Sequence, residues 1–402
     1  MENTKTIEVT LVRHGITTSN EAHLIVGWQD VELSAAGRKQ LEEYRDTIHY
    51  PEVQRFYSSD LKRAKDTFEI LFSPRYSIYR TLSGFREVYF GTHEGLTPEE
   101  NKKSGFYQHW LNAEKVNDEE SYEEFRQRVM EAFNDVVQES IHDGLEKIGI
   151  VLHEGSIKAI LMSLENRDFK YYQSFYFGNG LGLTLKLEVT ENDYKLVDKK
   201  LIQKEESINV VLVRHGISVA NENRIFAGIT DYDLGESGVK QLEEYRDMIA
   251  YPQPDRFYCS PLLRARRTFD ILFGDKHQVY RYLDNFKENN YGDYENTPTG
   301  PLAKKYFENW TQGILLSNEE PRDVFRKRVM DGLKLAYNQT KQDDFHSFGI
   351  VAHAGVIKTL LLDIRKQPYN EWNTIFIENG KGYVLNIEYI NDEPHLFSMQ
   401  MI

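Results

Sequence analysis

The sequence predicts an α/β fold that is built twice in one chain. The chain has 402 residues, which is long for one domain and comfortable for two of about 200 each. A segment that begins at residue 7 returns 201 residues later. Each copy alternates short apolar runs, typical of buried parallel strands, with longer segments of helical periodicity.

The internal repeat sets the predicted domain boundaries. IEVTLVRHGITTSN at 7–20 corresponds to INVVLVRHGISVAN at 208–221. The offset falls from 201 to 200 residues after Asn296, which indicates the loss of one residue there. We therefore predict domain 1 at 1–202, a short linker at 203–206 and domain 2 at 207–402. A linker of this length predicts that the two domains pack against each other.

The elements of the first copy follow from local patterns. IEVTLV at 7–12 is short, apolar and β-branched, as a buried strand requires. Ser34 is placed to cap the helix that follows. RFYSS at 55–59 predicts the end of a second strand, and Asp60 the start of a helix with apolar residues at helical spacing.

The second half of each copy predicts another strand followed by a helix. Ser121 and Glu124 form a capping-box pattern before a long helix. IGIVLHEG at 148–155 and FGIVAHAG at 348–355 are apolar runs that stop at a histidine. Because open α/β sheets bind ligands at the carboxyl ends of their strands, polar residues at these ends are candidate site residues.

Composition excludes several classes of function. The net charge of −14 argues against non-specific nucleic-acid binding. The start MENTKTIEVTLVRHG lacks a signal-peptide pattern, and no run approaches the roughly 20 apolar residues of a membrane span. A single cysteine, Cys259, suits a reducing compartment. We expect a cytoplasmic protein that binds neither nucleic acid nor membrane, and a homo-oligomer remains open.

Five side chains of the first copy suit phosphoryl transfer to a protein nucleophile. His14 offers a neutral nitrogen, and Arg13 beside it offers a cation for the phosphoryl oxygens. Arg63 adds a second guanidinium, whose planar fork matches phosphate. His153 can donate to the oxyanion, and Glu87 can protonate the leaving alkoxide. These residues predict a small phosphorylated substrate.

The second copy carries the same five residue types at matched spacing. The intervals from the first histidine are 49, 73 and 139 residues in the first copy, and 49, 73 and 138 in the second. Arg-His-Gly alone is a weak signal, whereas two matched sets are a strong one. The second set is Arg214, His215, Arg264, Glu288 and His353.

Several motifs together resemble the histidine phosphatase superfamily, which includes the cofactor-dependent phosphoglycerate mutases. They are LVRHG followed by Asn20, GWQDVELSAAG, SDLKRAKDT, REVYFGTHEG and VLHEG. The resemblance covers both halves almost end to end. It implies two tandem three-layer α/β/α domains, each a mostly parallel sheet with helices on both faces.

The resemblance also implies roles for individual residues. His14 and His215 would be transiently phosphorylated, and Glu87 and Glu288 fall at the family's proton donor. We expect no cofactor, and no metal ion either, because no histidine–carboxylate cluster in the sequence has metal-ligand spacing. The residues implied to hold the phosphoryl group are Arg13, Asn20, Arg63 and His153 in domain 1, and Arg214, Asn221, Arg264 and His353 in domain 2.

Two positions after the second histidine are of special interest. Glu154 stands where domain 2 has Ala354 and where the family usually has a small residue. Its carboxylate could point away from the pocket, repel phosphate, or bind a cationic substrate group such as an amine. For Lys158 and Lys358, one helical turn later, we expect surface roles.

Two competing signatures fail. Cys259 and Arg264 are separated by four residues, one too few for a cysteine-phosphatase loop, so Cys259 is expected to be a packing residue. Asp231 and Asp233 resemble a metal-dependent aspartate pair, but they follow a loop rather than a strand.

The leading hypothesis is a metal-independent phosphomonoesterase that uses a phosphohistidine and has two potentially active sites. A mutase is one alternative, although only 65 residues separate Glu87 from His153, and mutases of the superfamily typically carry a longer insertion there. A second alternative is a phospho-ligand binding or scaffold protein with one silent domain.

Overall fold

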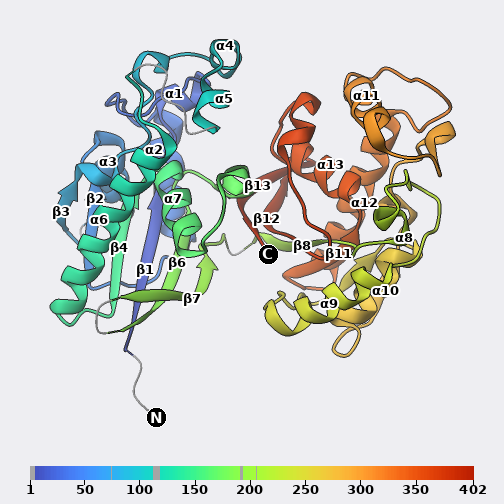
Figure 1. The fold of residues 1–402 in the computed structure, drawn as a ribbon. Coiled ribbons are helices and arrows are strands. Elements are labelled where there is room, and N and C mark those ends of the chain that lie inside the picture. Colours follow the sequence, from blue (N-terminus) through green and yellow to red (C-terminus); the bar gives the residue numbers. More distant parts are fainter. Residues whose placement is uncertain (1–4, 74, 112–117, 191–192, 205) are drawn as a thin grey trace. The chain divides into compact units, whose positions relative to one another are not determined.

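The chain forms two compact units, Met1–Glu205 and Glu206–Ile402 (Figure 1). The division falls inside the segment 203–206 that the sequence predicts as the linker. The structure is a computed structural model, and it describes residues 5–73, 75–111, 118–190, 193–204 and 206–402.

Unit 1 is built on a six-stranded sheet with the order β3-β2-β4-β1-β6-β7. The first four of these strands are parallel, whereas β6 runs antiparallel to both β1 and β7. The predicted α/β class is therefore confirmed, with an antiparallel edge added to a parallel core. The strands of this sheet are β1 (Lys5–Arg13), β2 (Arg55–Ser59), β3 (Ile78–Leu82), β4 (Lys147–Leu152), β6 (Gly182–Val189) and β7 (Tyr194–Leu201). A two-residue strand, β5 (Tyr176–Phe177), precedes β6.

The helices of unit 1 begin largely where the sequence predicts. The Ser34 hydroxyl accepts a hydrogen bond from the Gly37 N–H at 2.9 Å. Ser121 and Glu124 form the full reciprocal capping box. The α-helices are α1 (Thr18–Glu21), α2 (Ala35–Thr47), α3 (Lys62–Leu71), α4 (Pro98–Ser104), α5 (Phe106–Leu111), α6 (Tyr122–His142) and α7 (Glu154–Leu164).

One predicted helix start is wrong by two residues. The third helix, α3, begins at Lys62 rather than at Asp60. The Asp60 carboxylate instead forms an ion pair with Arg86 at 2.7 Å. The Lys62 N–H donates to Asp30, at 2.7 Å, so this more distant carboxylate caps the helix.

Helices cover both faces of the sheet in unit 1, as the alternation along β2 shows. The ring of Phe56 contacts Phe68 of α3, with ring centroids 5.2 Å apart. The next residue, Tyr57, points to the opposite face and donates from its hydroxyl to Glu139 of α6 at 2.9 Å. The three-layer arrangement follows from these contacts, because successive side chains of a strand point to opposite faces.

Unit 2 repeats this plan in its own strands, which run in the order β10-β9-β11-β8-β12-β13. Phe257 contacts Phe269 at 5.2 Å on one face, and Tyr258 donates to Gln339 at 3.2 Å on the other. The strands are β8 (Ile208–Arg214), β9 (Phe257–Cys259), β10 (Val279–Tyr282), β11 (Ser347–Ala352), β12 (Gly382–Ile390) and β13 (Glu393–Met401). The α-helices are α8 (Val219–Glu222), α9 (Glu236–Met248), α10 (Leu263–Phe273), α11 (Gly300–Thr311), α12 (Arg322–Gln342) and α13 (Ala354–Ile364).

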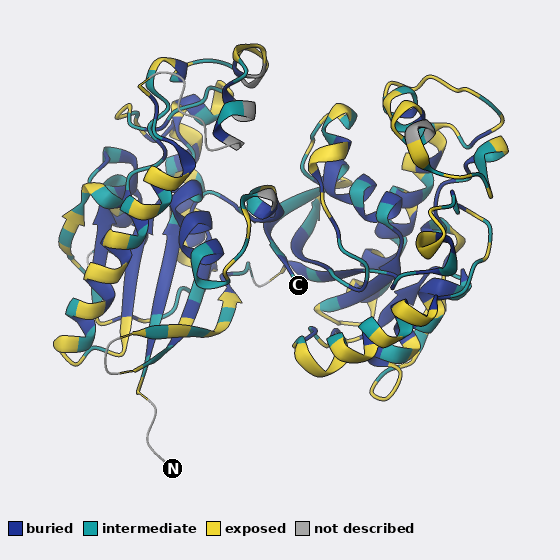
Figure 2. Ribbon diagram, in the orientation of Figure 1, coloured by how far each residue is buried: buried dark blue, intermediate teal, exposed yellow. Residues whose placement is uncertain are grey.

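The central strands of each unit are almost wholly buried (Figure 2). This agrees with their apolar sequences, because a parallel strand covered on both faces needs apolar residues throughout. Cys259 lies fully buried in β9, which confirms its packing role, and burial raises the pKa of its thiol. No helix in the described part of the chain is long and apolar enough to span a bilayer.

Candidate active sites

The candidate residues of domain 1 gather where three parallel strands end. The strands β2, β4 and β1 are neighbours in that order. Arg13 is the last residue of β1, and His153 follows β4 and forms the N-cap of α7. The rings of His14 and His153 lie 5.1 Å apart between centroids.

His14 is held in a single orientation by hydrogen bonds. Its main-chain N–H donates to the Leu152 carbonyl at 2.9 Å, and the Nδ1 atom of its ring lies 2.7 Å from the Gly15 carbonyl. A carbonyl can only accept, so Nδ1 carries the proton and Nε2 carries the lone pair. Burial, together with Arg63 and Arg13, holds the pKa of His14 well below its usual range. The ring is therefore neutral at pH 7, with Nε2 as the nucleophilic atom.

Arg63 joins the second histidine to a loop. Its Nε donates to Nδ1 of His153 at 3.2 Å, and its two terminal nitrogens donate to the carbonyls of Gln29 at 2.9 Å and Gly27 at 2.6 Å. A guanidinium has five N–H donors, so two remain for a phosphoryl group. Because Nδ1 of His153 accepts, its Nε2–H donates to the Ser59 hydroxyl at 2.9 Å.

This arrangement qualifies the expected role of His153. Burial and the charge of Arg63 hold the pKa of this histidine well below its usual range, so the ring is neutral. Both ring nitrogens already have partners in the protein. Donation to a phosphoryl oxygen would require Nε2–H to exchange its bond with Ser59, and that role stays a prediction.

Asn20 is oriented by the capping box at the start of α1, in which Thr17 is the N-cap. Its Oδ1 accepts from the Thr17 N–H at 3.1 Å and from the Thr17 hydroxyl at 3.0 Å. With the amide oxygen used inside the protein, the NH₂ group is the part of Asn20 that could donate to a ligand. This geometry is compatible with the phosphate-binding role predicted for it.

Glu87 receives two backbone hydrogen bonds. Its Oε2 accepts from the Gly155 N–H at 3.0 Å, and its Oε1 accepts from the Val88 N–H at 3.0 Å. Burial raises the pKa of Glu87, whereas these two N–H groups and Arg63 oppose that rise. A Cβ at position 155 would lie 2.0 Å from Oε1 of Glu87, so only glycine permits this approach.

Arg13 is paired with the residue that departs from the family pattern. Its Nη1 donates to the Phe177 carbonyl at 2.6 Å and lies 2.8 Å from Oε2 of Glu154. The other oxygen of Glu154 lies 2.8 Å from Nζ of Lys158. Glu154 therefore points toward the site, and the outward alternative is wrong. Lys158 is buried, so the surface role expected for it is also wrong.

Domain 2 builds the same site around the second nucleophile. Nδ1 of His215 donates to the Gly216 carbonyl at 2.7 Å, and burial with Arg264 and Arg214 holds the pKa of this histidine well below its usual range. Nε of Arg264 donates to Nδ1 of His353 at 3.3 Å. The rings of the two histidines lie 5.1 Å apart between centroids, as in domain 1.

The second glutamate and asparagine also keep their positions. Glu288 accepts from the N–H groups of Gly355 at 2.9 Å and Asn289 at 3.0 Å, and burial raises its pKa. Asn221 accepts through Oδ1 from the N–H of Ser218 at 3.1 Å. Glu288 and Asn221 thus lie in the same local setting as Glu87 and Asn20.

The two sites differ beside the first arginine. Ala354 offers no carboxylate, and the Arg214 Nη1 donates to the Ile377 carbonyl at 2.6 Å. Lys358 is half-buried, which contradicts the expected surface role, and its Nζ donates to the Trp372 carbonyl at 3.0 Å. Burial and then the charge of Arg214 lower the pKa of Lys358 to about 8.

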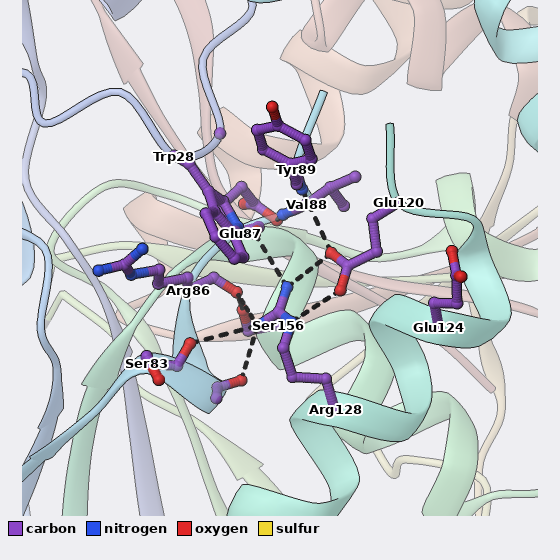
Figure 3. A network of polar contacts seen from close by, with 12 residues as sticks. Trp28, Ser83, Arg86, Glu87, Val88, Tyr89, Glu120, Glu124, Arg128 and Ser156 are labelled. Atoms are coloured by element: carbon purple, nitrogen blue, oxygen red, sulfur yellow. Dashed lines mark hydrogen bonds and ion pairs between the residues drawn. The ribbon is translucent and has the colours of Figure 1, made fainter. Parts of the chain in front are cut away.

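Sequence reasoning missed an arginine that supports the glutamate (Figure 3). Arg128 of α6 donates to the carbonyls of Arg86 at 3.1 Å and Glu87 at 3.2 Å, and it forms an ion pair with Glu120 at 2.7 Å. The indole N–H of Trp28 donates to the same Glu87 carbonyl at 3.0 Å. Arg128 therefore fixes the main chain that carries the proposed acid.

Other supporting residues were also missed. The side-chain NH₂ of Asn179 donates to the His14 carbonyl at 3.0 Å, and Thr67 accepts from the Gly15 N–H at 2.8 Å. Asn379 and Thr268 repeat these bonds in domain 2. The signal that could have found them is identity between the copies at the same offset, outside the recognised motifs.

The cations among the predicted phosphate-binding residues are guanidinium groups. Within the described ranges, no three His, Cys, Asp or Glu side chains are grouped as ligands of a metal ion. The guanidiniums among the predicted site residues are those of Arg13 and Arg63 in domain 1, and of Arg214 and Arg264 in domain 2. Each site thus combines a neutral histidine, two guanidiniums and a glutamate with a raised pKa.

Comparison with known proteins agrees with this class of site. The sequence profile of the histidine phosphatase superfamily (branch 1) matches residues 9–200 and again 210–400. The chain therefore belongs to the histidine phosphatase superfamily, and the assignment made from its motifs is confirmed.

Individual relatives match one domain's length of the chain. An uncharacterized phosphatase PhoE of Bacillus subtilis is 34% identical over 158 residues, which span 39% of this chain and 76% of the relative. A metal-independent phosphoserine phosphatase of Arabidopsis thaliana is 30% identical over 168 residues, 39% of this chain and 68% of the relative. The solved structure of Bacillus stearothermophilus YhfR has 24% identity and a TM-score of 0.42, and covers 48% of this chain and 95% of that one.

Proposed function

We propose that the protein is a metal-independent phosphomonoester hydrolase that acts through a phosphohistidine at two sites, one in each domain. The observation that carries the proposal is the hydrogen bond from Nδ1 of His14 to the Gly15 carbonyl at 2.7 Å, repeated at His215. It leaves Nε2 unprotonated beside two guanidiniums, as a nucleophile for phosphorus must be. The phosphatase names of the relatives support the same reaction class.

The first step transfers the phosphoryl group to the enzyme. Arg13, Arg63 and Asn20 hold the phosphoryl oxygens, and the Nε2 lone pair of His14 attacks phosphorus. The N–P bond forms as the P–O bond to the leaving group breaks. Glu87, whose pKa is raised by burial, gives its proton to the departing oxygen, so an alcohol leaves.

The second step returns the enzyme to its starting state. The Glu87 carboxylate takes a proton from water as the water oxygen attacks phosphorus. The N–P bond breaks, the lone pair returns to Nε2, and inorganic phosphate leaves. Glu87 is then protonated again and His14 neutral, so the cycle consumes one ester and one water. His215 and Glu288 carry the same steps in domain 2.

Independence from metal ions follows from the charge already present. Two guanidiniums at each site neutralise the phosphoryl oxygens, which is what a divalent cation would otherwise do. The Arabidopsis relative that is named metal-independent supports this part of the proposal.

The test is to incubate the full chain, dialysed against chelator, with an alkyl phosphate and to measure both products. Hydrolysis predicts equal amounts of alcohol and inorganic phosphate, formed without added metal. Transfer of phosphate to a second hydroxyl, with little inorganic phosphate, would indicate a mutase instead. Tight binding of the ester without turnover would indicate a scaffold.

A further inference from the structure

Domain 1 carries a charged triad beside its phosphoryl site that domain 2 lacks. Glu154 lies between two cations, with 2.8 Å to Nη1 of Arg13 and 2.8 Å to Nζ of Lys158. The side chain of Glu154 is 18% exposed and that of Lys158 is 7% exposed. Charges this well shielded from solvent interact more strongly than surface charges do. The carboxylate therefore offsets positive charge at the wall of the site.

The corresponding cations of domain 2 have no such carboxylate. In the part of the chain that the structure describes, Arg214 and Lys358 form no ion pair, and each donates to a backbone carbonyl. The nearby Glu378 is held by Lys381 at 2.9 Å. Burial and then the charge of Arg214 lower the pKa of Lys358, whereas Glu288 opposes this fall.

The two pockets therefore differ by one negative charge at an equivalent position. A substrate anion next to the phosphate would meet Glu154 in domain 1, where the two like charges repel each other. In domain 2 the same anion would meet Arg214 and Lys358 and relieve their repulsion. An ammonium group would experience the opposite preference.

We propose that Glu154 and Ala354 set the substrate charge of the two sites, so that domain 2 takes phosphomonoesters with a second anionic group and domain 1 takes neutral or cationic ones. This inference rests on the proposed hydrolase function and names its substrate classes. Neither residue takes part in the bond changes. Each acts on the part of the substrate beyond the phosphoryl group.

The test uses three phosphate esters of equal chain length and different charge: phosphoglycolate, ethyl phosphate and phosphoethanolamine. His215→Ala leaves domain 1 as the working site, and His14→Ala leaves domain 2. The specificity ratio is kcat/KM for phosphoglycolate divided by kcat/KM for phosphoethanolamine. We expect this ratio to be about tenfold or more higher in domain 2 than in domain 1.

Reciprocal variants then assign the difference to one position. Glu154→Ala in the His215→Ala chain should raise the ratio about tenfold, and Ala354→Glu in the His14→Ala chain should lower it about tenfold. Glu154→Gln, which keeps the shape of the side chain, should act like Glu154→Ala. Ethyl phosphate serves as the neutral reference and should change least.

Equal changes for all three esters in each variant would overturn the inference, because they would mean that Glu154 only competes with phosphate for Arg13. Unchanged ratios would overturn it as well, while turnover of ethyl phosphate would leave the hydrolase function intact. If no ester is hydrolysed, the proposed function fails. The association constant of phosphoglycolate divided by that of phosphoethanolamine, measured at equilibrium, then tests the inference by itself.

Discussion

Each proposed nucleophile is prepared by one hydrogen bond to its own neighbour in the chain. The Gly15 and Gly216 carbonyls take the Nδ1 protons and leave Nε2 for attack. Burial has the opposite effect on the pKa values of the proposed acids: it raises those of Glu87 and Glu288. Each site thus holds a neutral histidine and a glutamate whose side chain stays protonated at a higher pH than usual.

The acid role predicts a dependence on the leaving group. In the His215→Ala chain, Glu87→Gln should slow alkyl phosphates by about 10²–10⁴-fold, because the proton for the alkoxide is lost. Hydrolysis of p-nitrophenyl phosphate should change far less, since p-nitrophenolate leaves without a proton. The measurement is kcat for both substrates. An equal loss on the two would show that Glu87 only shapes the pocket.

The charge of Glu154 predicts a shift in the pH profile. Burial raises the pKa of Glu87 and the charge of Glu154 adds to this rise, and removing Glu154 also leaves Arg13 without its ion pair. Both effects favour the ionised form of Glu87 in Glu154→Ala. The acid is then lost at lower pH, so the alkaline limb of alkyl phosphate hydrolysis by domain 1 should move to lower pH. A limb that stays in place or moves to higher pH would contradict this coupling.

At the residue scale, the sequence predicted which side chains meet but not how they are paired. The matched intervals in both copies indicated His14, Arg63, Glu87 and His153 together. The position of Lys158 was wrongly predicted because α7 is buried on nearly all sides, so helical periodicity offers no exposed face. Its partner, Glu154, is the residue one turn earlier, and only the packed helix shows that both turn inward.

At the element scale, the site depends on strand ends and on one helix that holds a loop. The parallel neighbours β2, β4 and β1 bring their carboxyl ends together, which places residues from distant parts of the sequence in one site. The helix α6 contributes Arg128, whose guanidinium binds the main chain at Glu87 (Figure 3). The position of the acid thus depends on a helix that lies outside the recognised motifs.

Arg128 is accordingly a positioning residue, and its conservative variant should reveal this. Arg128→Lys cannot reproduce several fixed donors, so Glu87 should be misplaced and kcat for alkyl phosphates should fall by about 10- to 100-fold. The His215→Ala chain is the background for the assay. KM and the rate on p-nitrophenyl phosphate should change little.

Arg126→Lys is the matched control, because Arg126 lies on the same helix and pairs with Glu123 in a more exposed position. It should leave both rates unchanged. If Arg128→Lys reduced alkyl and aryl phosphate hydrolysis equally, or raised KM alone, Arg128 would be a general structural residue rather than one that acts through Glu87.

Helix caps and strands were predicted well, and the wrongly predicted start of α3 has a physical reason. The Ser34 cap and the Ser121–Glu124 box depend on neighbouring residues in the sequence, so local pattern was sufficient. The start of α3 depends on Asp30, which lies 32 positions before the capped Lys62. A cap from such a distance is visible only once the loop has folded over the helix.

At the scale of the whole molecule, the chain carries two complete sets of site residues. Both proposed nucleophiles are buried, neutral and oriented by the same bonds. The repeat in the sequence already predicted this, because duplicated spacing brings duplicated geometry. The sequence already showed that Glu154 of one copy is replaced by Ala354 in the other. Only the structure shows that the Glu154 carboxylate turns toward Arg13.

Two working sites predict that neither single variant abolishes activity. His14→Ala and His215→Ala should each retain part of the p-nitrophenyl phosphate activity, whereas the double variant should lose it by at least about 10³-fold. Steady-state rates at matched enzyme concentration, with thermal melting to verify folding, provide the comparison. A single variant that removes all activity, while the other removes none, would show that one domain is silent.

The central claim is that phosphate passes through His14 and His215, and trapping the intermediate tests it most directly. The full chain is mixed with radiolabelled phosphomonoester, quenched within the first turnover, and its labelled peptides are mapped by mass spectrometry. The account predicts label that is stable in alkali and lost in acid, on Nε2 of His14 and His215, and absent from the double alanine variant. Label on an aspartate or serine, or label that persists in the double variant, would contradict it.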